Sequence, residues 1–147
     1  MPDSKEFDVR EISWEEGSLE LAAVRRHVFM IEQNVPEDLE WDGVDPQCRH
    51  VIARDLGGCP IGVGRLLPVG HIGRMAVLKP WRGKGVGAAL LERLIGMARG
   101  EGRSSVVLSA QTYAMPFYAK FGFEQEGEEF MDAGIPHQAM RLGLSGE

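Results

Sequence analysis

A glycine-rich turn between a strand and a helix is the feature that most constrains this chain. Residues 82–87 read RGKGVG and stand between the strand-like run 72–78 and an apolar segment with helical spacing. The first amides of a helix have no partner within it and carry partial positive charge. Glycines let an anion approach such amides, and two cations add local charge. The turn therefore predicts a phosphate-binding site formed by Arg82, Gly83, Lys84, Gly85, Val86 and Gly87.

Three other interpretations of this turn compete with the first. A P-loop requires GxxxxGK[ST], which the sequence does not contain. Residues 83–88 match the dinucleotide pattern GxGxxA, but the next predicted strand ends SAQ, without the acidic residue that this fingerprint needs. In the third interpretation the glycines serve only a tight turn, although three glycines near the start of a helix reduce its stability.

Length, charge and cysteine content limit the class of protein. The 147 residues, 44% of them hydrophobic and 26% charged, fit one globular domain, expected at 5–145. A net charge of −6 argues against nucleic-acid or membrane partners, and no apolar run approaches the roughly 20 residues of a membrane span. Cys48 and Cys59 form no CxxC motif. We therefore expect no metal site and a reducing, cytoplasmic location.

The order of predicted elements indicates an α/β fold, in which helices pack on the faces of a mixed sheet. Strands are expected at 7–12, 50–55, 61–68, 72–78, 105–110, 123–130 and 137–144. Helices are expected at 19–31, at 86–100 and at 114–120. Leu19 is expected near the buried face of the first helix. The strand at 105–110 is almost continuously apolar, which predicts burial on both faces.

A second motif follows the strand at 105–110 and supports one interpretation of the turn. Residues 111–123 read QTYAMPFYAKFGF, which resembles the NxxAxxFYxxxGF pattern of the GCN5-related N-acetyltransferases, with Gln111 in place of asparagine. That family also carries [QR]xxGx[GA] in its pyrophosphate loop, and the turn at 82–87 is similar to it. The stretches 26–45 and 132–140 resemble the ElaA-like (YjcF-like) branch, so the resemblance covers nearly the whole chain.

The resemblance implies a fold and a reaction. The fold is a mixed, mostly antiparallel seven-stranded sheet with about four helices and a V-shaped split that holds acyl-CoA. The reaction is direct acetyl transfer from acetyl-CoA to an amine of a small molecule or a protein, and a homodimer is a further expectation. The alternatives are an enzyme that uses a longer acyl-CoA and an acyl-CoA sensor without turnover. The intact turn at 82–87 and Tyr118 favour an enzyme.

The same resemblance assigns roles to residues beyond the turn. The backbone of Met75, Ala76 and Val77 is expected to pair with the pantetheine arm of the cofactor, with the Val77 amide as an oxyanion donor. Gln111 is expected to contact the cofactor as well. Tyr118 is expected to meet the departing thiolate, and its alternative role is that of a core aromatic.

The general base is less defined. An alkylamine of pKa about 10.4 is neutral only about once in 2,500 at pH 7, so its acetylation needs a base. Many relatives place a glutamate on the strand before the phosphate loop, but residues 71–76 contain none. Glu32, Asp132 and His137 are candidates, and we favour Glu32 and His137, although a structural role remains open for both. The remaining histidines are expected to be structural or exposed: His27, His50 and His71.

An acidic segment precedes the second predicted strand. It contains Glu37, Asp38, Glu40, Asp42 and Asp45. One interpretation places it near the acceptor, where it attracts a cationic substrate, and the other is a solvated loop. Phe29 and Trp41 either line an acceptor pocket or pack this loop.

Overall fold

The computed structural model describes residues 6–37 and 41–144. In this part of the chain, the strands are β1 (Phe7–Ile12), β2 (Arg49–Asp55), β3 (Pro60–Leu66), β4 (His71–Val77), β5 (Ser105–Gln111), β6 (Glu124–Gln125), β7 (Phe130–Asp132) and β8 (Ile135–Gly143). The α-helices are α1 (Trp14–Arg25), α3 (Val86–Gly100) and α4 (Met115–Ala119). A π-helical segment, η1 (Arg26–Glu32), continues α1, and short 3-10 turns are η2 (Asp45–Gln47), η3 (Lys79–Trp81) and η4 (Thr112–Ala114). The bounds 5 and 145 of the expected domain lie outside the described residues.

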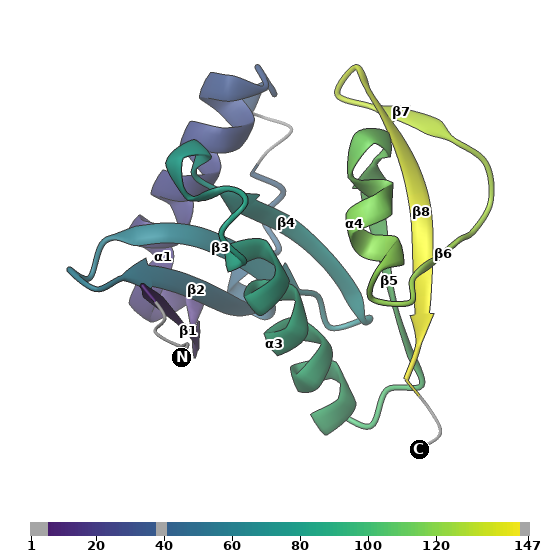
Figure 1. The fold of residues 1–147 in the computed structure, drawn as a ribbon, viewed down its shortest axis with the longest axis horizontal. Coiled ribbons are helices and arrows are strands. Elements are labelled where there is room, and N and C mark those ends of the chain that lie inside the picture. Colours follow the sequence, from purple (N-terminus) through teal and green to yellow (C-terminus); the bar gives the residue numbers. More distant parts are fainter. Residues whose placement is uncertain (1–5, 38–40, 145–147) are drawn as a thin grey trace.

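The described strands form one mixed sheet, as expected (Figure 1). Their order is β1-β2-β3-β4-β5-β8-β6, with β7 paired to β8, and every pairing is antiparallel except β4 with β5. The sheet has eight strands instead of seven, because the run expected at 123–130 is divided. Only Glu124–Gln125 pairs as β6, and a separate strand, β7, forms a hairpin with β8.

The first helix is the largest correction to the sequence prediction. It begins at Trp14, where the Ser13 side chain accepts a hydrogen bond from the Glu16 amide at 3.1 Å, and it becomes π-helical after Arg25. Leu19, expected near the buried face, is 87% exposed. The buried stripe consists of Leu21, Val24 and Val28, which pack against Ile52, Val63 and Ala76 of the sheet.

Helix α3 covers the opposite face of the sheet and lies very close to β3. An added Cβ at Gly62 would lie 3.0 Å from side-chain atoms of Val86 and Leu90, and one at Gly64 would lie 2.9 Å from Leu94. These two glycines therefore let the helix sit directly on the strand. The packing holds the start of α3 beside the end of β4, where the predicted phosphate site lies (Figure 1).

Strand β5 does not have two buried faces. Its burial alternates: Val106, Leu108 and Ala110 are buried in the core, whereas Ser109 is exposed. The prediction of a doubly buried strand was wrong because the other face borders a cavity. Within the described chain, every helix is too short or too polar to span a bilayer.

Candidate active site

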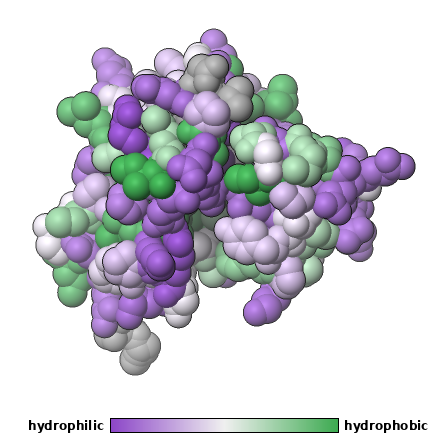
Figure 2. Space-filling view, turned by 90° about the horizontal axis from the view of Figure 1, so that it is seen from above, coloured by the Kyte–Doolittle hydropathy of each residue, from purple (hydrophilic) through white to green (hydrophobic). Residues whose placement is uncertain are grey.

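The sheet opens between β4 and β5. These parallel strands pair only at His71 with Val107 and Ile72 with Leu108. Beyond that point they diverge around a cavity of about 380 Å³. The space-filling view is hollowed between the two halves of the molecule, and hydrophilic side chains cover much of this face (Figure 2). The V-shaped split implied by the resemblance is therefore present.

A β-bulge in β4 faces this split. Val63 pairs with Ala76 and Arg65 with Gly73, so Arg74 and Met75 together oppose one residue of β3. Arg74 has a φ of +50°, a left-handed conformation that fits the bulged position. The bulge locally interrupts the ladder where β4 borders the cavity.

Val77 turns its backbone groups toward the open split. The Leu78 amide donates to the Ile61 carbonyl of β3 at 2.9 Å. Because backbone groups alternate along a strand, those of Val77 point to the opposite edge. Arg82 confirms this direction, since its Nε donates to the Val77 carbonyl at 2.8 Å. The Val77 amide is therefore directed into the open split.

The start of α3 presents unpaired amides. Gly83 and Gly85 have φ values of +78° and +89°. Gly85 is the N-cap residue, and as a glycine it has no side chain to cap the helix amides. The first hydrogen bond of the helix runs from the Ala89 amide to the Gly85 carbonyl at 3.0 Å. The amides of Val86, Gly87 and Ala88 therefore precede the helical hydrogen-bond pattern. Among the described residues other than the chain neighbours, no heavy atom lies within 4 Å of an added Cβ at Gly83 or Gly85, so the approach is open.

Other residues of the turn have mixed surroundings. Lys84 is exposed, whereas Val86 is buried in the core beneath the helix. An added Cβ at Gly87 would lie 3.5 Å from the Phe117 ring, so this glycine also allows α4 to approach. Arg82 Nη2 lies 2.5 Å from Glu32 Oε1, and its guanidinium is therefore already engaged.

Tyr118 lies on α4 and lines the cavity. Its hydroxyl is 4.0 Å from the Met75 sulfur across the split. The ring packs edge-on against Phe117 and Phe123, so the residue also contributes to the core, the alternative that the sequence left open. Burial, with a smaller contribution from Tyr113, raises the pKa of Tyr118 to about 12. The phenol therefore carries its proton at neutral pH and is a hydrogen-bond donor into the cavity.

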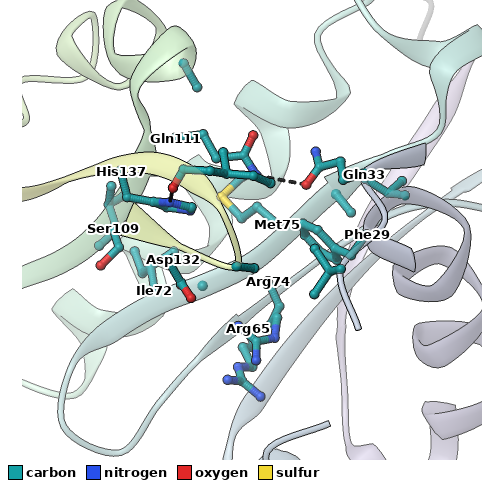
Figure 3. Close-up of a pocket in the computed structure, with 18 of the residues that line it drawn as sticks. Phe29, Gln33, Arg65, Ile72, Arg74, Met75, Ser109, Gln111, Asp132 and His137 are labelled. Carbon is teal, nitrogen blue, oxygen red and sulfur yellow. Dashed lines mark hydrogen bonds between the residues drawn. The ribbon is translucent and has the colours of Figure 1, made fainter. Parts of the chain in front are cut away.

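Gln33 is a cavity residue that the sequence analysis did not single out. Gln111 Nε2 donates to Gln33 Oε1 at 2.9 Å, which connects β5 with the residue after η1 (Figure 3). Phe29 lines the same side of the cavity, one of its two expected roles. The signal was present, because Gln33 directly follows Glu32 in the ElaA-like stretch.

The candidate bases occupy different places. His137 and Asp132 line the cavity from the β7–β8 hairpin (Figure 3). Glu32 is not among the lining residues, and His27 lies 3.7 Å from its carboxylate. His71 lines the closed end of the split, where no functional signal was seen in the sequence. Its pKa is lowered by burial and by the nearby Arg65.

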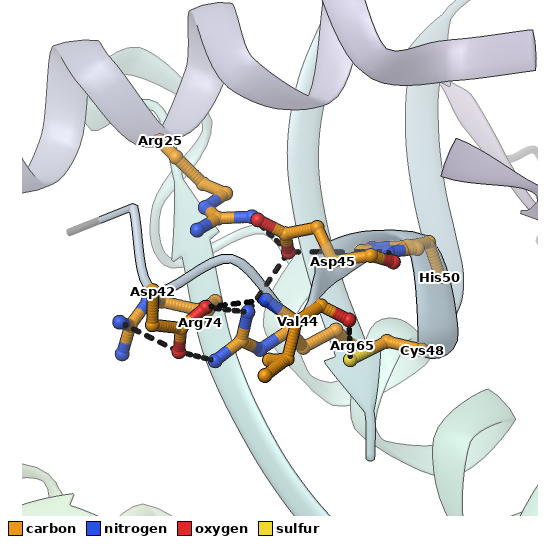
Figure 4. A network of polar contacts seen from close by, with 8 residues as sticks. All are labelled: Arg25, Asp42, Val44, Asp45, Cys48, His50, Arg65 and Arg74. Carbon is orange, nitrogen blue, oxygen red and sulfur yellow. Dashed lines mark hydrogen bonds and ion pairs between the residues drawn. The ribbon is translucent and has the colours of Figure 1, made fainter. Parts of the chain in front are cut away.

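The described part of the acidic segment is mainly structural. Asp45 accepts hydrogen bonds from Arg25 at 2.7 Å and Arg65 at 2.8 Å, and Asp42 pairs with Arg65 and Arg74 (Figure 4). The hydrogen bonds from Arg65 lower the pKa of Asp42 to about 2. These arginines neutralise the charge of both carboxylates. Asp42 and Asp45 therefore belong neither to a solvated loop nor to a free acidic patch.

The other predicted members of this segment differ. Glu37 is exposed, whereas Asp38 and Glu40 lie outside the described residues. The Trp41 ring packs against the Arg25 guanidinium at 4.8 Å, which supports the loop-packing alternative for this residue.

His50 is buried and its Nε2 lies 2.9 Å from the Asp45 carbonyl, which confirms a structural role. The described residues contain no group of three or more His, Cys, Asp or Glu that could hold a metal.

Comparison with known proteins gives consistent results. The family model described as "Acetyltransferase (GNAT) domain" matches residues 17–144. The uncharacterized N-acetyltransferase YjcF of Bacillus subtilis is 42% identical over 121 residues, covering 80% of this chain and 86% of that protein. A Pseudomonas aeruginosa acyl-CoA N-acyltransferase structure has TM-score 0.82 and 30% identity, covering 92% and 98% of the two chains. Escherichia coli ElaA has TM-score 0.81 and 28% identity, covering 91% and 98%.

Proposed function

The chain belongs to the GNAT family and is an acyl-CoA-dependent N-acetyltransferase, and we propose that acetyl-CoA is its donor and a small-molecule or protein amine its acceptor. The observation that carries this proposal is the position of three features around one split. The bulged edge of β4 and Tyr118 line the cavity. Arg82 lines it too and leads directly into the amide-rich start of α3.

The start of α3 holds the diphosphate of the cofactor in this proposal. Three successive amides, those of Val86, Gly87 and Ala88, supply hydrogen-bond donors and the positive end of the helix dipole. Lys84 is exposed beside them and supplies a cation. The resemblance also assigned Arg82 to this site. Its present contacts with Glu32 and Val77 support a role in holding the loop against β4.

The pantetheine arm then lies along the open edge of β4. Met75, Ala76 and Val77 border the cavity, and the arm replaces the strand that is missing on this side. Gln111 faces the arm from β5. The Val77 amide stabilises the oxyanion that forms when an amine attacks the thioester. Holding donor and acceptor in one cavity supplies roughly 7–11 kcal/mol of the barrier.

Tyr118 donates a hydrogen bond to the departing thiolate. Complete proton transfer from a phenol of pKa about 12 to a thiolate whose thiol has a pKa of about 8.5 is uphill by roughly 5 kcal/mol. Tyr118 therefore stabilises the leaving group by a hydrogen bond while keeping its own proton. This role requires the hydroxyl to face the space next to Met75, as it does here.

Two further expectations belong to the proposal. Cys48 and Cys59 are both free in the described chain, which is compatible with a reducing cytoplasm. A homodimer stays a prediction, which light scattering of the purified protein checks.

The test is the release of CoA in the presence of a panel of amines. We expect amine-dependent thiol release from acetyl-CoA, faster than from propionyl-CoA or butyryl-CoA. Reactions without amine measure simple hydrolysis. Calorimetric binding of acetyl-CoA without turnover on any amine would support a sensor and contradict the proposed reaction. Faster release from a longer acyl-CoA would revise the donor alone.

A further inference from the structure

The orientation of the His137 ring determines which of its nitrogens faces the cavity. Its Nδ1 lies 2.7 Å from the Ile135 carbonyl oxygen. A carbonyl only accepts hydrogen bonds, so Nδ1 carries the proton of the neutral ring. Nε2 then carries a lone pair. Among residues 6–37 and 41–144, no hydrogen bond to Nε2 is present.

Neighbouring residues hold the ring in this orientation. His137 is 9% exposed and pairs opposite Gln111 of β5 and Phe130 of β7. The Phe130 ring stacks on the imidazole at 5.8 Å and 24°. Figure 3 shows the imidazole projecting from β8 into the cavity, on the side of Met75. The free lone pair is therefore held in the space that the proposed function assigns to the reacting groups.

The competing groups are less suited to take a proton there. Glu32 is paired with Arg82 at 2.5 Å and does not line the cavity. Asp132 lines the cavity but is exposed to solvent, where its charge attracts a cationic acceptor. His71 lies at the closed end of the split, where β4 and β5 still pair, and Arg65 acts on it electrostatically.

We propose that His137 Nε2 is the general base that deprotonates the acceptor ammonium, an inference that rests on the proposed acetyl transfer. The ammonium gives one proton to Nε2, and the resulting amine lone pair forms a C–N bond with the thioester carbon. The C–S bond then breaks, and the electron pair leaves on sulfur. The second amine proton passes to that thiolate, which Tyr118 hydrogen-bonds. The proton on Nε2 returns to water.

The first experiment observes the ring itself. In ¹⁵N-labelled protein, long-range imidazole NMR spectra distinguish the Nδ1–H from the Nε2–H tautomer at a pH where the ring is neutral. The spectrum of His137→Asn assigns the signal by its absence. We expect the Nδ1–H tautomer with unprotonated Nε2. An Nε2–H tautomer overturns the proposal, whether or not any amine is acetylated.

The second experiment separates a base from a structural residue. Asparagine at position 137 keeps an N–H that can donate to Ile135 but removes the basic nitrogen. With ethylamine, which is mostly protonated at neutral pH, we expect kcat/KM to fall about 10²- to 10⁴-fold. With 2,2,2-trifluoroethylamine, which is already mostly neutral, the fall should be at least about ten times smaller.

Matched controls make each outcome decisive. His27→Asn replaces a histidine that does not line the cavity, and it should retain wild-type rates. Equal losses of kcat/KM for both amines in His137→Asn would mean a structural role and overturn the proposal. The acetyl-CoA affinity of His137→Asn should remain within about threefold of that of the wild type. Failure of the wild type to acetylate any amine would instead refute the proposed function, while the NMR result still decides the ring orientation.

Discussion

Arg82 Nη2 lies 2.5 Å from Glu32 Oε1, so an ion pair joins the phosphate-binding turn to the end of η1. The same guanidinium donates to the Val77 carbonyl at 2.8 Å. Arg82 therefore joins the turn to the nearby end of β4 and to η1, which lies far from it in the sequence. The arrangement indicates that Glu32 helps to position the turn, because its carboxylate is already paired and lies outside the cavity lining.

This relationship predicts the behaviour of Glu32→Gln. The amide still accepts a hydrogen bond from Arg82, so acetyl-CoA affinity should change by less than about fivefold, as for a partly exposed pair. The loss of kcat/KM should be equal for ethylamine and 2,2,2-trifluoroethylamine, because Glu32 does not accept the amine proton. Steady-state kinetics with both amines measures this loss of kcat/KM. A loss confined to ethylamine would identify Glu32 as the base.

Tyr118→Phe should reduce turnover more than binding. Within the described residues the hydroxyl has one hydrogen-bond partner, the Met75 sulfur at 4.0 Å, so its removal should alter the melting temperature little. We expect kcat to fall about 10- to 100-fold while acetyl-CoA affinity stays within about threefold. The exposed Tyr113→Phe is the matched control and should keep its kcat. Unchanged kcat in Tyr118→Phe would assign Tyr118 to the core alone.

Gly85→Val should weaken CoA binding by roughly 10-fold or more. A β-branched residue at a φ of +89° is strained, and its side chain blocks the approach to the amides. Gly96→Ala is the control, because Gly96 lies within α3, where an added Cβ contacts no described residue outside the helix backbone within 4 Å. That change should stabilise the helix by about 0.5–1 kcal/mol without altering affinity. Calorimetry that finds equal affinity for both variants would contradict the phosphate contact.

Much of this site was predictable because its signals are local. The turn at 82–87 and the motif at 111–123 each lie within one short segment, and the structure brings both to the split between β4 and β5. The positions of β1 to β4 followed from apolar periodicity and turn residues. The start of α1 also has a local signal, since Ser13 and Glu16 form a capping pattern six residues before the predicted start at residue 19.

The remaining features depend on contacts between distant segments. Asp42 and Asp45 read as surface acids, but Arg65 of β3 and Arg25 of α1 pair with them. The position of His137 depends on the β7–β8 hairpin, which replaced part of a longer predicted strand. Such pairings are set by the tertiary fold, so neither composition nor periodicity reveals them.

The ion pair between Asp42 and Arg65 predicts a pH dependence of stability. The pKa of Asp42 is lowered from 3.8 to about 2, so its ionised form stabilises the folded state above pH 3.8. This contribution is lost as the pH falls through about 2. The difference in unfolding free energy between wild type and Asp42→Asn should therefore shrink between about pH 5 and pH 2. Urea denaturation measures it, and a difference that does not change with pH would contradict the assignment.

A crystal structure of the protein with CoA bound tests the central claim most directly. We expect diphosphate oxygens within hydrogen-bond distance of the Val86, Gly87 and Ala88 amides, and the cofactor sulfur beside the Tyr118 hydroxyl. A diphosphate bound away from the start of α3, or a sulfur on the far side of β4 from Tyr118, would contradict the account.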